Sequence, residues 1–239
     1  MNRQKKAIGL IGGMGPDAYA RLYGLIVDMA RKNFGAVKNS DYPEIILFSV
    51  PVPDFIENKK NMNKALVMLN QKLKTLGQLD LCSLGIACNT AHILIPKMKR
   101  YLGRNFISMI EKTVKDIEKK KYRKVGILGS PITIKSRLYQ TELNRKGIEF
   151  VLPNNKDTSR LGRIILDVVS GKQNKVTARN LLEIAGRLKK AGAEAIILGC
   201  TELPLIFPKH YVLPIIDTNV ILAEALLKSY YAEAKFDVE

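Results

Sequence analysis

Two of the three cysteines stand in similar surroundings, one in each half of the chain. Cys88 lies in the segment 86–92 (IACNTAH), and Cys200 lies in the segment 198–204 (LGCTELP). Each cysteine ends an apolar run that predicts a buried strand, and each is followed by hydroxyl and amide residues that can begin a helix. A helix N-terminus stabilises negative charge, so a thiol placed there can become a thiolate base or nucleophile. The pair therefore indicates a reaction that needs two similar groups facing each other.

Paired thiols of this kind suit the inversion of an amino acid at its α-carbon. In racemisation the α-proton leaves one face and another proton returns to the opposite face. One thiolate and one thiol on opposite sides meet this requirement, and their roles exchange when the reaction reverses. Each positioned acid/base group supplies about 10²–10⁴-fold in rate, so orientation and electrostatic stabilisation in a dry cleft must supply the remainder.

The elements that must position the two thiols alternate along the whole chain. Alternating strand and helix patterns predict parallel sheets with helices on both faces. Strands are expected at 7–12, 44–50, 81–87, 125–129, 148–152 and 195–199, and helices at 17–33, 61–76, beyond 89, 133–146, 158–169, 176–191 and 218–232.

The pattern restarts halfway along the chain. The segment 8–12 (IGLIG) resembles 125–129 (VGILG), and 20–23 (ARLY) resembles 136–139 (SRLY), in the same order as the two cysteines. This duplication predicts an α/β fold with two similar lobes whose parallel sheets are related by pseudo-twofold symmetry. Because ligands bind at the carboxyl ends of parallel strands, we expect the active site in the cleft between the lobes.

The predicted lobes follow from where the pattern restarts. The N-terminal lobe comprises residues 1–107 plus 217–239 and carries Cys88. The C-terminal lobe comprises residues 108–216 and carries Cys200.

The composition is that of a soluble globular protein with an excess of basic residues. The chain has 39 Lys and Arg against 22 Asp and Glu, a formal net charge of +17. Such a charge attracts nucleic acid or anionic membranes in some proteins. Here the basic residues are spread widely and no aromatic-basic interleaving marks a nucleic-acid surface, so we favour a solvated basic surface that attracts anionic substrates.

Cysteine usage and hydropathy indicate the compartment. Three cysteines without regular spacing argue against a disulfide scaffold and fit a reducing cytosol. No apolar stretch is long enough to span a bilayer, so no membrane partner is predicted. The chain is therefore expected to be cytoplasmic.

Other residues with chemical potential have simpler interpretations. Cys82 lies inside an apolar run and is expected in the core. His92 is expected either to tune a group in the cleft or to satisfy a structural hydrogen bond. The segment 12–15 (GGMG) lacks phosphate-loop spacing and predicts a tight turn that brings backbone amides close to a substrate. Asp54 and Asp217 stand beside a turn or a helix start, where aspartate commonly caps. No metal site is predicted, since the chain has no Cys-x-x-Cys pair and only two histidines.

Several segments together resemble the aspartate/glutamate racemase family, and within it the aspartate racemase branch. They are 12–16 (GGMGP), 51–54 (PVPD), 87–92 (ACNTAH), 199–204 (GCTELP) and 214–218 (PIIDT), and the resemblance covers nearly the whole chain. It implies a homodimeric amino-acid racemase that uses two cysteines without pyridoxal phosphate or metal, with aspartate as substrate and glutamate or another amino acid as the alternatives.

The resemblance also assigns roles to individual residues. Cys88 and Cys200 are implied to be catalytic, and the substrate-binding residues implied are Met14, Asn89, Thr90, Ala91, Thr133, Thr201 and Glu202. Two positions depart from the family pattern. Phe55 stands where aspartate-preferring members carry arginine, and Ser170 stands where they tend to carry lysine. An apolar ring does not replace a bidentate arginine contact, so the departures weaken the case for aspartate.

Two other functions remain open at this point. A related two-cysteine enzyme isomerises or decarboxylates a small diacid, with one cysteine as the nucleophile. Alternatively, the chain is a catalytically silent protein that binds a small molecule or a nucleic acid through the cleft or the basic surface.

Overall fold

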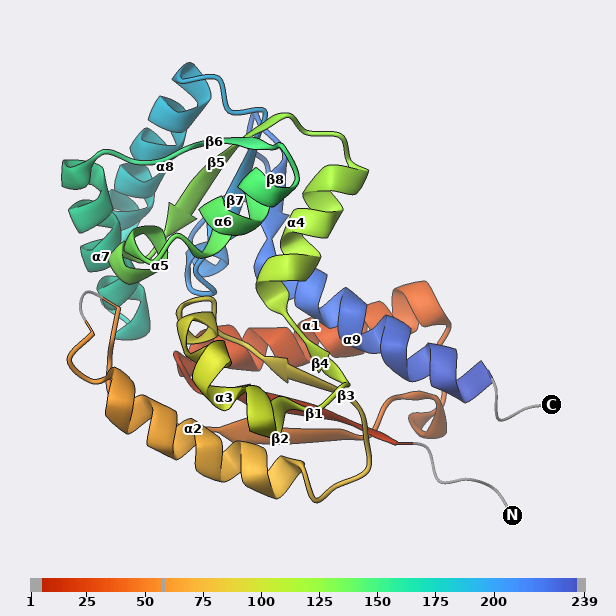
Figure 1. The fold of residues 1–239 in the computed structure, drawn as a ribbon. Coiled ribbons are helices and arrows are strands. Elements are labelled where there is room, and N and C mark those ends of the chain that lie inside the picture. Colours follow the sequence, from red (N-terminus) through yellow and green to blue (C-terminus); the bar gives the residue numbers. More distant parts are fainter. Residues whose placement is uncertain (1–5, 57–58, 236–239) are drawn as a thin grey trace, which may run out of the picture.

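Two parallel four-stranded sheets organise the molecule. The computed structural model describes residues 6–56 and 59–235 of the 239-residue chain (Figure 1). The two sheets share one topology. In spatial order, the strands of the first sheet are β2 (Ile45–Ser49), β1 (Ala7–Gly12), β3 (Leu81–Ile86) and β4 (Phe106–Ile107). Those of the second sheet are β6 (Glu149–Val151), β5 (Lys124–Gly129), β7 (Ala195–Gly199) and β8 (Ile215–Asp217). The predicted α/β fold with two similar lobes is therefore confirmed.

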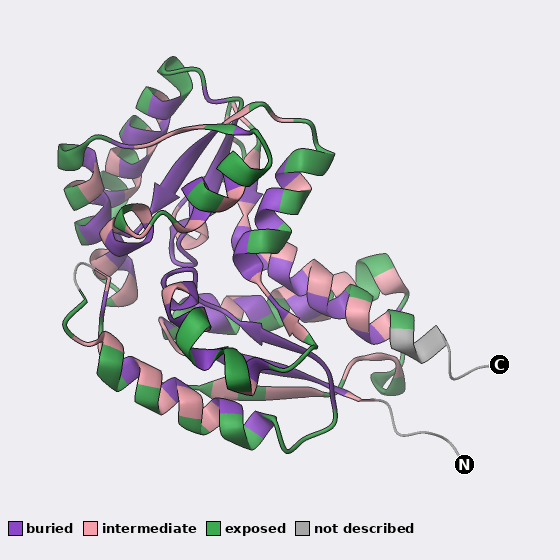
Figure 2. Ribbon diagram, in the orientation of Figure 1, coloured by how far each residue is buried: buried purple, intermediate pink, exposed green. Residues whose placement is uncertain are grey.

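In the first lobe, helices cover both faces of the sheet. Helices α2 (Met62–Leu76) and α3 (Ile95–Leu102) pack on one face. Helices α1 (Pro16–Phe34) and α9 (Thr218–Lys235) pack on the other. Because both faces are covered, every residue of β1 and β3 is buried (Figure 2).

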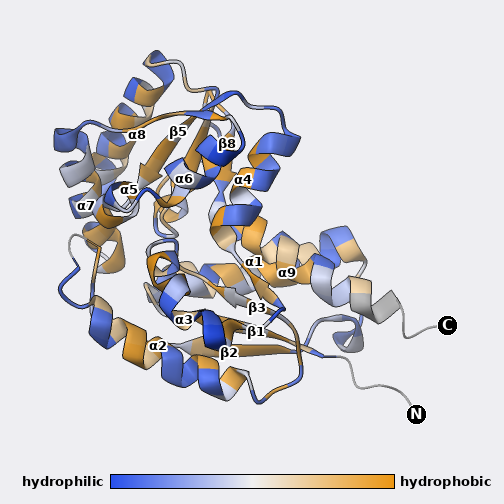
Figure 3. Ribbon diagram, viewed as in Figure 1, coloured by the Kyte–Doolittle hydropathy of each residue, from blue (hydrophilic) through white to orange (hydrophobic). Residues whose placement is uncertain are grey.

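The second lobe repeats this three-layer arrangement. Helices α7 (Asn155–Val169) and α8 (Lys175–Lys190) cover one face of its sheet. Helices α4 (Met109–Lys119) and α6 (Leu138–Arg145) cover the other. Figure 3 shows the resulting pattern, with apolar central strands inside helices whose outer faces are hydrophilic.

Helix α9 connects the two halves. It begins directly after β8 of the second sheet, yet it packs mainly against α1, α4 and β3. This course agrees with grouping residues from 217 onward with the N-terminal lobe, although the division of the chain into 1–107 plus 217–239 and 108–216 stays a prediction. Residues 1–5 and 236–239 of that division lie outside the described residues.

The structure differs from the sequence expectations in a few places. The helix expected at 133–146 is two helices, α5 (Pro131–Lys135) and α6, because Arg137 adopts a left-handed conformation with φ 55°. The short edge strands β4 and β8 were not predicted. Cys88 precedes a 3-10 helix (Thr90–Leu94) that leads into α3, and Cys200 precedes only a short 3-10 helix (Leu203–Leu205). Neither cysteine therefore sits at an α-helix N-terminus.

Candidate active site

The two cysteines meet at the carboxyl ends of equivalent strands. Cys88 comes just after β3, and Cys200 comes directly after β7, the equivalent strand of the second sheet. Their exposed fractions are only 7 % and 6 %, and each packs into the core of its own lobe. Both nevertheless line one cavity of about 80 Å³. This volume is several times the roughly 10–15 Å³ that one ordered water needs.

The cavity wall combines segments from both lobes. The first lobe contributes the turn after β1, the segment after β2 and the Cys88 loop. The second lobe contributes the last residue of α7 and the Cys200 loop. The lining residues are Gly13, Met14, Gly15, Pro16, Val52, Pro53, Asp54, Phe55, Ile56, Cys88, Asn89, Thr90, Val169, Cys200, Thr201 and Glu202.

The turn after β1 has the tight shape that its glycines allow. Gly13 has a φ of 86°, and a side chain there would meet the backbone nitrogen of Val50 at 2.6 Å. The next glycine in the turn, Gly15, donates its N–H to Oε1 of Glu202 at 2.8 Å. This backbone amide therefore holds a side chain of the opposite lobe, and the expected approach of the turn's amides to a substrate stays a prediction.

Glu202 is the charged centre of the site. Besides the Gly15 amide, its carboxylate accepts from the Cys200 Sγ at 2.9 Å and from the Thr201 hydroxyl at 3.1 Å, both on Oε2. Burial raises the pKa of the Cys200 thiol well above its usual value, and the negative charge and acceptor oxygen of Glu202 raise it further. Cys200 is therefore held as a thiol.

Cys88 has different neighbours. Burial raises the pKa of its thiol to about 12, and the negative charge of Glu202 adds to the rise. The backbone N–H groups of Ala91 and Thr90 act in the opposite direction, because they bond to the sulfur and favour the thiolate. Individual amides of the 3-10 turn thus do what the sequence interpretation attributed to a helix N-terminus.

Thr90 joins the Cys88 loop to the second lobe. Its hydroxyl is 3.0 Å from the Ser130 hydroxyl and 3.0 Å from the Thr133 hydroxyl. Ser130 also caps α5, since its Oγ accepts from the Thr133 N–H. The three buried hydroxyls form one connected network across the lobe boundary.

Asn89 makes a second link between the lobes. Its Nδ2 donates to the Thr218 hydroxyl at 3.1 Å, and its Oδ1 accepts from the Tyr139 hydroxyl. Thr218 in turn donates to the carbonyl of Leu198 in β7. These bonds fix the Asn89 side chain from two elements of the second half of the chain.

Five of the seven substrate-binding residues inferred from the sequence line the cavity: Met14, Asn89, Thr90, Thr201 and Glu202. The other two are absent from the lining. Thr133 is fully buried behind Thr90, where it takes part in the hydroxyl network. Ala91 is fully buried in the core, and its backbone N–H faces the Cys88 sulfur.

His92 has a structural role beside the site. Met109 donates its N–H to Nε2 at 3.1 Å, so Nδ1 carries the proton and donates to the Cys88 carbonyl at 2.8 Å. Burial lowers the pKa of His92 to about 4. Of the two alternatives that the sequence left open for His92, these bonds favour the structural one.

The two aspartates singled out in the sequence differ from each other. Asp217 caps α9 by accepting from the Asn219 N–H, and it pairs with Arg21 at 2.5 Å. The cap expected for Asp217 is thus present. Asp54 is exposed and lines the cavity, and its backbone carbonyl accepts from the Asn61 side chain.

The residues that sequence reasoning missed are mostly apolar or remote. Ser170, which was compared with a family lysine, is exposed, and its hydroxyl donates to the Leu166 carbonyl. The preceding residue, Val169, lines the cavity instead. No sequence signal marks Val169 or Tyr139, because each reaches the site from a helix far along the chain.

A second, larger hollow lies between α4, α9 and β4. Its volume is about 780 Å³, and it is lined by Cys82 among exposed charged side chains. The Cys82 Sγ donates to the Ala7 carbonyl at 3.4 Å and packs in the core, as expected. Within the described part of the chain, no cluster of three or more His, Cys, Asp or Glu side chains is arranged to hold a metal ion.

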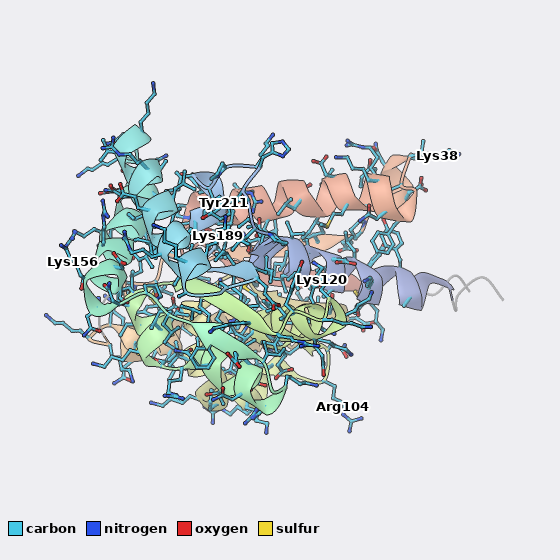
Figure 4. The ribbon with its side chains drawn as sticks, turned by 90° about the horizontal axis from the view of Figure 1, so that it is seen from above. Lys38, Arg104, Lys120, Lys156, Lys189 and Tyr211 are labelled. Atoms are coloured by element: carbon cyan, nitrogen blue, oxygen red, sulfur yellow. The ribbon has the colours of Figure 1, made fainter. Side chains whose placement is uncertain are left out.

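The excess positive charge is distributed around the outside of the molecule. Lys38, Arg104 and Lys156 project from widely separated elements in Figure 4. None of the lysines or arginines in the described ranges lines the cavity. The helices of those ranges include none that is long and apolar enough to cross a membrane.

Comparison with known proteins identifies the architecture. Residues 11–226 match the Asp/Glu/Hydantoin racemase family. The chain belongs to this family. The prediction of an isomerase of the racemase type is confirmed by this match.

Individual family members cover nearly the whole chain. The broad specificity amino-acid racemase RacX of Bacillus subtilis is 27% identical over 229 residues, which are 94% of this chain and 98% of RacX. The structure of an aspartate racemase from Picrophilus torridus superimposes with a TM-score of 0.82 at 28% identity, covering 95% of this chain and 94% of that one. A glutamate racemase from Francisella tularensis, at 18% identity and a TM-score of 0.67, shares the fold (96% of this chain, 82% of that one).

Proposed function

We propose that the protein is a cofactor-independent amino-acid racemase in which Cys88 and Cys200 are the two acid/base groups. One observation carries the proposal: two thiols, delivered by equivalent strands of two lobes, line a single small cavity. Family membership supports the reaction class. The names of RacX and of the Picrophilus torridus aspartate racemase support an amino acid as the substrate.

The different neighbours of the two thiols support a direction for the first proton transfer. Two backbone N–H groups favour the thiolate of Cys88. Cys200 has one such group, and its thiol also donates a hydrogen bond to the Glu202 carboxylate. In the proposed step, the Cys88 thiolate takes the α-proton and the Cys200 thiol gives its proton to the opposite face of the α-carbon. The products are the other enantiomer, a Cys88 thiol and a Cys200 thiolate, and proton exchange with water restores the starting state.

Substrate binding itself helps to generate the thiolate. The negative charge of Glu202 raises the pKa of both cysteines. An α-ammonium group in the cavity neutralises that charge and lowers both pKa values. The substrate α-carboxylate then bonds to a donor of the loops, for which Asn89 is a candidate because its side-chain amide has a second N–H besides the one given to Thr218.

The two-base proposal is tested by racemisation without added cofactor. Purified enzyme is given L- and D-amino acids in deuterated water, with a metal chelator present, and both inversion and α-deuterium incorporation are followed. We expect Cys88→Ala and Cys200→Ala each to lower racemisation by about 10³-fold or more, within the range of positioned acid/base groups. Cys82→Ala is the matched control, because this thiol is equally buried but lies outside the cavity.

The same experiment separates the proposal from its alternatives. Full racemisation by either cavity variant contradicts the two-base mechanism. Loss of carbon dioxide or formation of an isomer without α-deuterium exchange supports a two-cysteine decarboxylase or isomerase of a small diacid. Salt-sensitive binding to nucleic acid, with no turnover of any amino acid, supports a silent binding protein.

We further propose a cytoplasmic homodimer without a nucleic-acid partner. The three cysteines, all within the described residues, form no disulfide with one another, which fits a reducing compartment. Sedimentation of the purified protein tests the dimer, and fractionation of cells that express it tests the location.

A further inference from the structure

We infer, resting on the proposed racemase function, that the substrate is an α-amino acid whose side chain carries no negative charge. The observation is the charge balance of the cavity. Among the described residues that line it, Asp54 and Glu202 are acidic, and none is Lys, Arg or His. A substrate with a second carboxylate enters a site that has two negative groups and no cation to receive it.

The carboxylate of Glu202 is stabilised by dipoles, not by an opposite charge. Its oxygens accept from the Gly15 amide, the Cys200 thiol and the Thr201 hydroxyl, all of which are uncharged donors. Its full negative charge therefore acts on the cavity. The α-ammonium group of an amino acid balances this one negative charge. For a substrate with a neutral side chain, the α-carboxylate is then the only anion that the hydrogen-bond donors of the site must hold.

The rest of the wall suits an apolar side chain or stem. Phe55 has an exposed fraction of 5 % and packs into the core, so its ring is a fixed apolar surface. Val52, Pro53, Ile56 and Val169 extend this surface. These apolar side chains offer no hydrogen-bond donor to replace the water that a side-chain carboxylate loses on entry.

The cations nearest to these segments in the sequence do not line the cavity. Arg21 is paired with Asp217 and does not line the cavity. Lys59 and Lys172 are exposed, and they too are absent from the lining. Ser170, at the end of α7, points its hydroxyl back to the helix.

Isosteric substrates isolate the effect of charge. The purified enzyme is given L-Asp and L-Asn, then L-Glu, L-Gln and L-Met, and kcat/KM is measured for both inversion and α-deuterium exchange. We expect each neutral substrate to exceed its acidic counterpart by about 100-fold, because an uncompensated like charge a few ångströms away acts in a poorly solvated site. The measured quantity is the ratio of kcat/KM for each neutral substrate to kcat/KM for its acidic counterpart.

Charge-introducing variants test whether the wall itself sets the preference. Val169→Lys and Phe55→Arg each place a cation in the cavity, and we expect either one to raise kcat/KM for L-Glu relative to L-Gln by at least about tenfold. Ser170→Lys is the matched control, since it adds the same charge to the neighbouring exposed position and should leave the ratio unchanged. Circular dichroism checks that each variant is folded, and Val169→Lys, at a half-buried position, remains informative if the buried Phe55→Arg is not.

The outcomes distinguish this inference from the function on which it rests. If L-Asp or L-Glu is converted as fast as its amide, the inference on substrate charge is wrong while the racemase function stands. If no amino acid exchanges its α-proton, the proposed function itself is wrong. A shift of the Glu-to-Gln ratio in Ser170→Lys as large as in Val169→Lys also overturns the inference, because the effect then does not come from the cavity.

Discussion

The two halves of the active site use the same position for different chemistry. Two residues after each cysteine, a side chain crosses to the start of the helix that follows the first strand of the opposite lobe. Thr90 reaches Ser130 and Thr133 at the start of α5, and Glu202 reaches Gly15 at the start of α1. The Glu202 side chain also accepts from the thiol of its own cysteine, whereas Thr90 bonds to the Cys88 sulfur only through its backbone N–H.

Two lobes of the same topology can therefore place their cysteines in unequal surroundings. The matched sheets bring Cys88 and Cys200 to one cavity, which is what a two-base reaction requires. Burial raises the pKa of both thiols, and the residue two positions later adds a difference between them. At Cys88 it is a threonine whose backbone N–H favours the thiolate. At Cys200 it is a glutamate whose carboxylate accepts from the thiol and raises its pKa further.

The largest expected effect comes from removing the charge that distinguishes the halves. Glu202→Gln keeps an oxygen for the Gly15 amide but takes away the negative charge and places an amide donor near Cys200. We expect the pKa of the Cys200 thiol to fall by about one to three units, and the rate to rise at lower pH than in the wild type. Ultraviolet thiolate absorbance measures this pKa in a background of Cys82→Ala and Cys88→Ala, where Cys200 is the one cysteine left, and the same titration of a variant that also carries Cys200→Ala subtracts the tyrosine signal.

The equivalent change in the other half is the control for this titration. Thr90→Val removes a neutral hydroxyl and should shift the Cys200 pKa by no more than a few tenths. An unchanged Cys200 pKa in Glu202→Gln would mean that burial alone keeps this thiol protonated. The proposed asymmetry between the thiols would then have no basis.

The comparison also explains which parts of the site could be predicted from sequence. The strand ends that deliver Cys88 and Cys200 are local features, because apolar runs followed by polar residues mark them. The bond between Gly15 and Glu202 joins residues 187 positions apart, and no local pattern encodes it. Val169 lines the cavity only because α7 ends there.

Sequence similarity alone also matched residues that are not equivalent in the fold. The resemblance of 20–23 (ARLY) to 136–139 (SRLY) pairs Tyr23 with Tyr139. Tyr23 lies within α1 with an exposed fraction of 46 %, whereas Tyr139 is fully buried and donates to Asn89. The strand match of 8–12 with 125–129 does correspond to equivalent strands, because burial on both faces of a central strand restricts nearly all of its residues to apolar or small types.

An effect of intermediate size is the pH dependence of stability that arises from His92, which has no counterpart in the Cys200 half. Four residues after Cys88 stands His92, and four residues after Cys200 stands Pro204. His92 is neutral, with its pKa lowered to about 4, while the unfolded chain titrates near its usual value of about 6.5. Below about pH 6.5 the unfolded state therefore binds more protons, and we expect the free energy of unfolding to drop by roughly 3 kcal/mol between pH 6.5 and 4 from this group.

Urea unfolding across this pH range measures the contribution. His92→Gln retains one donor and one acceptor but cannot titrate, so its stability should fall less steeply with decreasing pH than that of the wild type. His210→Gln is the matched control, because His210 is exposed in a loop and its removal should preserve the wild-type slope. Equal slopes for wild type and His92→Gln would show that the ring does not remain neutral in the folded state.

The smallest expected effect tests whether Thr90, the uncharged counterpart of Glu202, mainly stabilises the contact between the lobes. Thr90→Val keeps the side-chain shape and removes the hydroxyl that meets Ser130 and Thr133. Those two hydroxyls still bond to each other at 2.9 Å, so we expect a loss of only about 1 kcal/mol in the free energy of unfolding. Thr75→Val, at an exposed position of α2, is the control and should change stability by less than about 0.5 kcal/mol.

A double-mutant cycle of Thr90→Val with Thr133→Val assigns this loss to the contact between the lobes. The coupling free energy should be about 1 kcal/mol if the two hydroxyls stabilise each other across the boundary. A coupling near zero would mean that Thr90 acts within its own lobe. In that case the hydrogen bond from Gly15 to the charged carboxylate of Glu202 would be the stronger link between a helix start and a cysteine loop. The two halves would then differ in how they hold the lobes together, as well as in the protonation of their thiols.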